Sequence, residues 1–229
     1  MSKLLRIPTL AAFALIAGVT LFTAGCGTDH GRVRVVHASP DAPNVDVLVD
    51  GRKVLTNVAY ETASPYLTLE TGSRKVEVRA TGTTTDAITA TATVASHKDY
   101  TILAVGKLAA ISALVLQDDN SAPAAGQIKL RVIHASPSAG NVDVYVVAPG
   151  TDLTTVTPTL SNIAFKTASA YLSVAAGSYE VFVTPTGSKT AVIDSGSLTF
   201  TAGQIRTVVA LDADATGTSF TAIVLNDRN

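Results

Sequence analysis

Hydrophobic and polar residues alternate along many short stretches of this chain. Residues 32–37 and 75–79 place valines on one face and polar residues on the other, as half-buried β-strands do. Residues 45–49 also alternate and are followed by Asp50-Gly51, a pair that favours a tight hairpin turn. No stretch shows a sustained helical period. Short strands about ten residues apart with turn signals are typical of an all-β sandwich or barrel. We expect further strands at residues 66–70, 88–94, 100–105 and 111–116.

The same pattern occurs twice in the chain. His37-Ala38-Ser39-Pro40 followed by Asn44-Val45-Asp46-Val47 recurs as His134-Ala135-Ser136-Pro137 followed by Asn141-Val142-Asp143-Val144, 97 residues later (134 minus 37). Later matches, such as Asn57 with Asn162, are 105 residues apart. The second copy therefore has eight extra residues (105 minus 97), which fall within residues 148–160 and predict a longer loop there.

This repeat predicts two small antiparallel β-sandwich domains of matching topology, either immunoglobulin-like or transthyretin-like. We place the first domain at residues 32–117 and the second at residues 128–229. Residues 118–127 have the composition of a linker. The alternating valines and the last leucine of each repeat should be core residues, namely Val33, Val35, Val47, Val76, Val78 and Leu116 in the first domain and Val132, Val144, Val181, Val183 and Leu225 in the second.

The N-terminus has the features of an export signal. Two basic residues precede the apolar stretch 10–22, which is too short to span a membrane comfortably, and small residues follow it. Thr23-Ala24-Gly25-Cys26 resembles a bacterial lipobox, whose cysteine becomes lipid-modified and begins the mature chain. We therefore predict a signal peptide at residues 1–25, a lipid anchor on Cys26 and a tether at residues 26–31. An ordinary secretory signal with an incidental cysteine is the alternative.

Composition narrows the possible partners. The net charge is −1 and no basic block is present, whereas phosphate contacts need clustered Lys and Arg. We therefore expect no nucleic-acid partner. The single cysteine excludes an intrachain disulfide. Aromatic residues make up only 5% of the chain, with no Trp, which is few for an aromatic sugar-binding platform.

The run from Val35 to Pro43 together with Val45-Asp46-Val47 resembles the signature of the domain-of-unknown-function 4397 family, and the block Ala63-Ser64-Pro65-Tyr66-Leu67 is similar to that family as well. The resemblance covers nearly all of the chain after the signal peptide. It implies an exported bacterial protein, often a lipoprotein, with a β-rich fold, and it implies no catalytic residues. The second copy departs from the pattern at three positions, Ser138, Gly140 and Ala170.

The His-Ala-Ser-Pro motif is the first candidate site. His37 and His134 extend core-facing rows to the ends of their strands. We interpret them as structural residues that hydrogen-bond the turns at Ser39-Pro40 and Ser136-Pro137. The alternative is a metal ligand or an acid–base group acting with Asp46 or Asp143. One histidine and one carboxylate are too few for a closed metal site, so we predict no metal and no cofactor.

The remaining candidates are acidic and aromatic. If the valine rows are buried, Asp46 and Asp143 face outward as solvated charges. The alternative is a hydrogen bond to a neighbouring turn, or half of a cation site with Asp41. Tyr66 and Tyr171 have the opposite parity to their core neighbours. They either cover a sheet edge or form part of a binding surface, and covering is the more common role of a lone tyrosine.

These patterns favour a non-enzymatic, lipid-anchored envelope protein with two modules for adhesion, scaffolding or assembly. If the host has two membranes, Gly27 after the cysteine favours the outer one. A protein or glycan at the cell surface is the expected partner. The alternative is a ligand-binding protein for a glycan, peptide or cation, using residues 40–44 and 137–141. An enzyme is the third hypothesis, but no Gly-x-Ser-x-Gly, His-Glu-x-x-His or phosphate-loop motif occurs.

Overall fold

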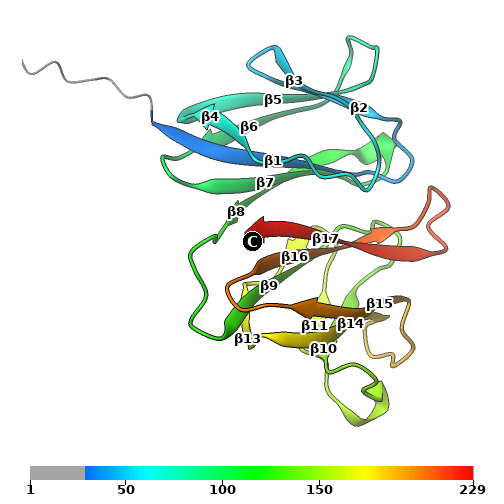
Figure 1. Ribbon diagram of the computed structural model, residues 1–229. Helices are drawn as coiled ribbons and strands as arrows, with labels where there is room; N and C mark the ends of the chain where they lie inside the picture. Colours follow the sequence, from blue (N-terminus) through cyan, green and yellow to red (C-terminus); the bar gives the residue numbers. More distant parts are fainter. Residues whose placement is uncertain (1–28, 229) are drawn as a thin grey trace, which may run out of the picture.

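The computed structural model describes residues 29–228, and Figure 1 shows that they form two β-sandwich modules, one above the other. The predicted signal peptide and residues 26–28 of the predicted tether, including Cys26, lie outside the described residues. Module 1 contains β1 (His30–Ala38), β2 (Val45–Val49), β3 (Arg52–Val58), β4 (Leu67–Glu70), β5 (Gly72–Ala80), β6 (Asp86–Val94), β7 (Asp99–Val105), the short 3₁₀ turn η1 (Leu108–Ala110) and β8 (Ser112–Asp118). Module 2 contains β9 (Gln127–His134), β10 (Val142–Val147), η2 (Leu153–Thr155), β11 (Leu160–Ile163), β12 (Thr167–Ala168), β13 (Leu172–Ala175), β14 (Gly177–Pro185), β15 (Ile193–Phe200), β16 (Ile205–Asp212) and β17 (Phe220–Arg228).

The all-β prediction is confirmed, and the two modules share one topology. The sheets of module 1 have the orders β4-β1-β7-β8 and β3-β2-β5-β6; those of module 2 have the orders β12-β9-β16-β17, with β13 also on β9, and β11-β10-β14-β15. The immunoglobulin arrangement pairs the first and second strands in one sheet. Here β1 and β2 lie in different sheets, which leaves the transthyretin-like alternative.

The sheets are antiparallel with one exception in each module. β1 runs parallel to β7, and β9 runs parallel to β16. The sequence did not predict this pairing, because alternation within a strand carries no information about the direction of its neighbour. The predicted hairpin is present between β2 and β3. Asp50 and Gly51 have φ angles of 50° and 77°, the two positive values that a type I′ turn requires.

Each module has its own core between its two sheets, and most of the predicted core residues are buried there. The exception is the last strand of each module. Leu116 is half-buried and packs, like the buried Leu225, in a third cluster that lies between the modules. The predicted place of Leu116 in the core of module 1 is therefore wrong. Its strand β8 turns Ala113 toward that core and Leu116 toward module 2.

The modules pack through one sheet each. The sheet containing β1, β7 and β8 faces the sheet containing β9, β16 and β17, so the molecule has four layers (Figure 1). The residues between β8 and β9 connect the two inner layers at one end. None of the described elements is a helix long and apolar enough to cross a membrane.

Candidate functional site at the interface between the modules

The interface has an apolar centre to which both modules contribute equivalent residues. Every residue of this cluster has a repeat counterpart that also belongs to it. The pairs are Val36 and Ile133, Ala38 and Ala135, Tyr60 and Phe165, Ala63 and Ala168, Leu103 and Val209, Val105 and Leu211, Leu114 and Ile223, and Leu116 and Leu225. The two faces therefore meet in the manner of a twofold, isologous interface within one chain.

Two buried ion pairs cross this interface in opposite directions. Arg34 of module 1 places Nη2 2.6 Å from Oδ1 of Asp227 in module 2. Arg131 of module 2 places Nη2 2.6 Å from Oδ1 of Asp118 in module 1. All four side chains are at most 3% exposed. Because each module supplies one arginine and one aspartate, the buried charges balance.

The carboxylates receive the same additional bonds on both sides. Thr101 donates to Oδ2 of Asp118 at 2.7 Å, and Tyr66 donates to the same oxygen at 2.6 Å. These contacts satisfy the carboxylate that Arg131 binds, as a buried charge requires. In the other direction, Asp227 accepts from Thr207 at 2.5 Å and from Tyr171 at 3.0 Å.

Tyr66 and Tyr171 also cover the arginines of their own modules. The Arg34 guanidinium carbon lies 4.9 Å from the centre of the Tyr66 ring, and that of Arg131 lies 4.7 Å from the Tyr171 ring, within the range of cation–π attraction. Burial raises the pKa of both hydroxyls above the usual value. Each tyrosine thus contacts both the arginine and the aspartate of its own module.

The His-Ala-Ser-Pro motif lies beside this interface. His37 is fully buried; its Nε2 lies 3.1 Å from the Pro43 carbonyl, and its Nδ1 lies 3.4 Å from the Ser39 amide nitrogen. The ring therefore bridges the turn at half-buried Pro40. It packs edge-on against Tyr60, with ring centres 5.9 Å apart.

The second copy repeats the Nε2 contact and the edge-on packing, here against Phe165 with ring centres 6.2 Å apart, but Nδ1 of His134 has no hydrogen-bond partner among the described residues. Nε2 of His134 lies 2.7 Å from the Gly140 carbonyl, across the turn that contains half-buried Pro137. Burial lowers the pKa of both His37 and His134. Ser136 donates its hydroxyl to the buried carboxylate of Asp212. Because this serine bonds the carboxylate and the imidazole bonds the turn, the three side chains do not form a nucleophile–base pair.

The outward, solvated orientation expected for Asp46 and Asp143 is wrong. Their exposed fractions are 1% and 5%. Each accepts a hydrogen bond from the amide of a turn residue in the left-handed region, Asn57 at 2.9 Å and Asn162 at 2.7 Å. The alternative, a bond to a neighbouring turn, describes these contacts. The turn folds over the outer face of the strand and removes the carboxylate from water, which alternation within the strand could not reveal.

The two copies hold this carboxylate with different further donors. Lys53 and Thr81 also donate to Asp46, at 2.5 and 3.1 Å. With the Asn57 amide, they lower the pKa of Asp46 to about 2, and Lys53 has the largest effect. Asp143 accepts instead from the Gly187 amide at 2.9 Å. No group of three or more His, Cys, Asp or Glu side chains within residues 29–228 could hold a metal ion.

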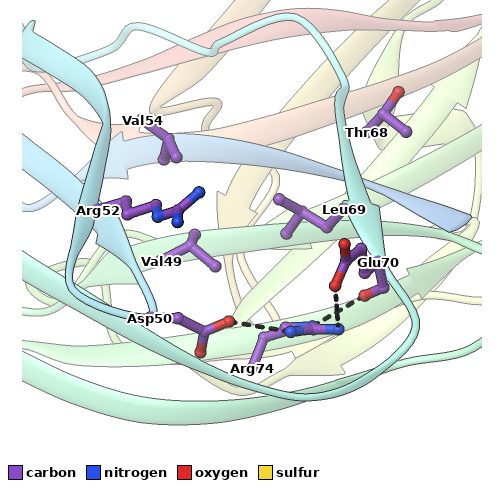
Figure 2. A pocket seen from close by; sticks show the side chains of 8 residues that line it. All are labelled: Val49, Asp50, Arg52, Val54, Thr68, Leu69, Glu70 and Arg74. Carbon is purple, nitrogen blue, oxygen red and sulfur yellow. Dashed lines mark hydrogen bonds and ion pairs between the residues drawn. The ribbon is translucent and has the colours of Figure 1, made fainter. Parts of the chain in front are cut away.

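A pocket of about 490 Å³ lies on the solvent side of module 1 (Figure 2). Val49, Val54 and Leu69 form its apolar wall, and Asp50, Arg52, Glu70, Thr68 and Arg74 complete the lining. Arg74 donates to the Glu70 carbonyl at 2.9 Å and to Asp50 at 3.1 Å, so it ties the β2–β3 hairpin to the turn before β5. The predicted binding loop at residues 40–44 precedes β2, whereas the pocket lies at the opposite end of that strand.

Sequence reasoning missed the four charged residues of the interface. The sequence places Asp118 at the start of the predicted linker, but it is the last residue of β8. Arg34 and Arg131 are 97 residues apart, and Asp118 and Asp227 occupy matched strand ends. These matching charges at equivalent positions of the two repeats were the signal in the sequence that could have revealed the interface. The contacts themselves join residues 193 positions apart in the Arg34 pair, and local patterns do not reach that far.

The fold and the interface define a tandem β-sandwich protein whose modules are joined face to face. The chain belongs to the family described as "Domain of unknown function (DUF4397)", which matches residues 31–145 and 147–229. The two matched segments meet at Val146 in β10, whereas the sheets divide between β8 and β9. No curated protein matches the sequence.

Two solved structures are similar to the chain. A leucine-rich repeat protein from Bacteroides thetaiotaomicron has 16% identity over 78% of this chain, with a TM-score of 0.19, and the chain spans 26% of that protein. A protein from Bacteroides fragilis, described as "a putative cell adhesion protein", has 8% identity over 86% of this chain and 98% of its own length, with a TM-score of 0.22. Similarities this distant indicate neither the fold nor the function of this chain.

Proposed function

We propose that the chain is a non-enzymatic, lipid-anchored envelope protein whose two modules act as one rigid unit in scaffolding or assembly. The interface carries this proposal. Two flexibly joined modules would need no buried charges between them, whereas Arg34 and Arg131 each cross to the other module. A buried ion pair is costly unless its geometry is satisfied, and it specifies one relative orientation. A fixed orientation serves presentation or assembly more directly than it serves chemistry.

The anchor completes the proposal. Module 1 begins at His30, only four residues after Cys26, so lipid on that cysteine would hold the module close to the membrane face. Lipid chains contribute ~0.8 kcal/mol per buried CH₂, and stable anchoring takes more than one chain. We expect lipidated Cys26 to be the first residue of the mature protein, in the outer membrane where the host has two. Intact-mass analysis of envelope fractions measures this, and a soluble mature form that begins elsewhere would refute the anchor.

The function is tested in cells that lack the protein. We expect altered envelope integrity, measured as detergent sensitivity, and restoration by the natural chain. Cys26→Ser and the interface variant Arg34→Ala should fail to restore it, while the outer-face variant Arg74→Ala should succeed at equal abundance. An unchanged envelope in the deletion strain, or full restoration by the interface variant, contradicts this function.

A ligand-binding role is the second candidate, and the pocket in Figure 2 favours it. Its size is within the range of about 300–1,000 Å³ that small-molecule sites occupy. Exposed Arg52 and Glu70 beside an apolar wall would suit a small peptide or an acidic sugar. Amide chemical shifts of β2 and β5 during titration with such compounds test this role, with Arg52→Ala as the control. Unchanged shifts at millimolar ligand would exclude it.

A further inference from the structure

We propose that each inner face is self-complementary, so that a module can pair with the same module of a second chain, and that chains assemble by exchanging modules across this interface. The proposal rests on the assembly function proposed above and names its partner, a second copy of this chain. Each inner face carries both halves of the charge pattern. Module 1 has Arg34 and Asp118, and module 2 has Arg131 and Asp227.

The charge pattern permits pairing of like modules. In an isologous interface, residue i of one copy contacts residue j of the other, and j contacts i. Two copies of module 1 placed in this geometry would join Arg34 to Asp118 of the second chain, twice. Two copies of module 2 would join Arg131 to Asp227 in the same way. No like charges would meet in either pairing, so the ion pairs impose no preference for unlike modules.

The apolar surface of each inner face also allows like modules to pair. Its matched positions hold residues of similar size, such as Val36 with Ile133 and Leu116 with Leu225. Within this apolar cluster, the largest chemical difference is Tyr60, whose repeat counterpart is Phe165. The Tyr60 hydroxyl donates across the interface to the main-chain carbonyl of Asp212 at 2.5 Å. Every residue has such a carbonyl, so the bond can also form with Gly106, the counterpart of Asp212 in module 1.

The connection between the modules decides which pairing prevails. Residues 119–126 hold the two faces of one chain at an effective concentration on the order of millimolar. Lys129 also fixes the connection, because its Nζ lies 2.6 Å from Oδ2 of Asp119 and 3.1 Å from its carbonyl oxygen. An isolated chain therefore closes on itself. Pairing between chains requires that closure be prevented or that chains be concentrated, as anchored chains on a membrane are.

The test exchanges the charges on one face only. In the double variant Arg34→Asp with Asp118→Arg, closure within a chain would set aspartate against Asp227 and arginine against Arg131. Pairing of module 1 with module 1 of a second chain would restore both ion pairs, and pairing of module 2 with module 2 would keep its own. We expect light scattering to give twice the monomer mass or more at micromolar concentration, whereas the natural chain should be monomeric.

Two control variants distinguish pairing through self-complementary faces from nonspecific association. The variant Arg34→Asp with Arg131→Asp opens the interface equally but leaves only acidic charges, so it should stay monomeric. The quadruple variant, which adds Arg131→Asp and Asp227→Arg to the double variant, restores closure and should also be monomeric. A folded double variant that remains monomeric overturns the proposal, and so does association of the all-acidic variant.

If the exchanged charges prevent folding, a deletion variant that keeps the natural residues of both inner faces decides the question. Deleting residues 119–126 joins the last residue of β8 directly to the first residue of β9. Packed sheets lie ~10 Å apart, which one peptide bond cannot span, so the two faces of one chain cannot close on each other, whereas the interface cluster and the four charged residues are kept. We expect this chain to show native strand content by circular dichroism and to form dimers or larger species. A folded monomer would overturn the proposal. The complementation experiment is independent of these masses, since a rigid unit can support the envelope whether or not chains exchange modules.

Discussion

The inner and outer sheets of the two modules differ in how far the repeats have diverged. At the inner sheets, every residue of the interface cluster has a counterpart in the same cluster, and both ion pairs are present. Away from the interface, Arg74 of β5 and Glu70 of β4 in module 1 correspond to Tyr179 of β14 and Ala175 of β13 in module 2. The longer loop of module 2 adds η2 and packs Leu153 into a buried position.

The difference shows where the fold tolerates change. An inner-face residue is constrained by its own module and by the other one, because a buried charge or methyl group needs a fixed partner. An outer-face residue contacts solvent and can be replaced at little cost. The outer faces are therefore where the two modules can acquire different roles, while the inner faces keep them joined.

The largest effect should come from breaking one ion pair. Arg34→Ala leaves Asp227 buried without its arginine, which costs about 3–5 kcal/mol of unfolding free energy. We expect the chain from residue 27 onward to lose stability by about that amount in urea denaturation. We also expect two unfolding transitions instead of one, since losing one of the two ion pairs weakens the coupling between the modules.

The matched variant Arg131→Ala should also lose stability, but by less, because its partner Asp118 is equally buried yet keeps Arg34 Nη2 3.9 Å from its Oδ2. A loss below about 1 kcal/mol, as for an exposed ion pair, would show that water reaches the charges. It would also remove the distinction between the inner and outer faces.

The histidine turns should show the next largest effect. His37→Ala leaves the Pro43 carbonyl without its ring donor, and His134→Ala does the same to Gly140. Each orphaned group costs ~1–3 kcal/mol. Thermal unfolding should show that each variant destabilises its own module. If both variants melt like the parent while binding of a metal or ligand disappears, the structural interpretation of the histidines is wrong.

The same histidines predict a dependence of stability on pH. Burial lowers their pKa in the folded chain, so the unfolded chain, with a histidine pKa of about 6.5, binds protons more readily. Their contribution to stability is therefore complete above about pH 6.5 and declines as the pH falls below that value. Urea denaturation at a series of pH values should show this decline. The double variant His37→Ala with His134→Ala should show a shallower one, and an identical pH profile would contradict the assignment.

Local patterns in the sequence were sufficient for the all-β class, the β2–β3 turn and the repeat, because each depends on neighbouring residues; the strand β3 was not among the expected strands. They failed where a residue's environment is set by distant chain segments. Leu116 alternates like a core residue but contacts the other module. Asp118 follows a strand and precedes a polar run, so it was assigned to the linker, although it ends β8 as a buried charge. Asp46 alternates outward but is covered by a turn.

The smallest effects should come from the outer faces, where two different side chains make one equivalent bond. Arg74 Nε donates to the Glu70 carbonyl at 2.9 Å, and the Tyr179 hydroxyl donates to the corresponding Ala175 carbonyl at 2.8 Å. Both contacts are reached by water, which replaces a lost donor, and exposed ion pairs contribute only ~0.2–1 kcal/mol. We expect Arg74→Ala and Tyr179→Phe each to lower the unfolding free energy by less than about 1 kcal/mol, with the single transition kept. A loss as large as that of Arg34→Ala would mean that the turn before β5 or β14 holds its module together, and that divergence at the outer face is as constrained as the inner contacts are.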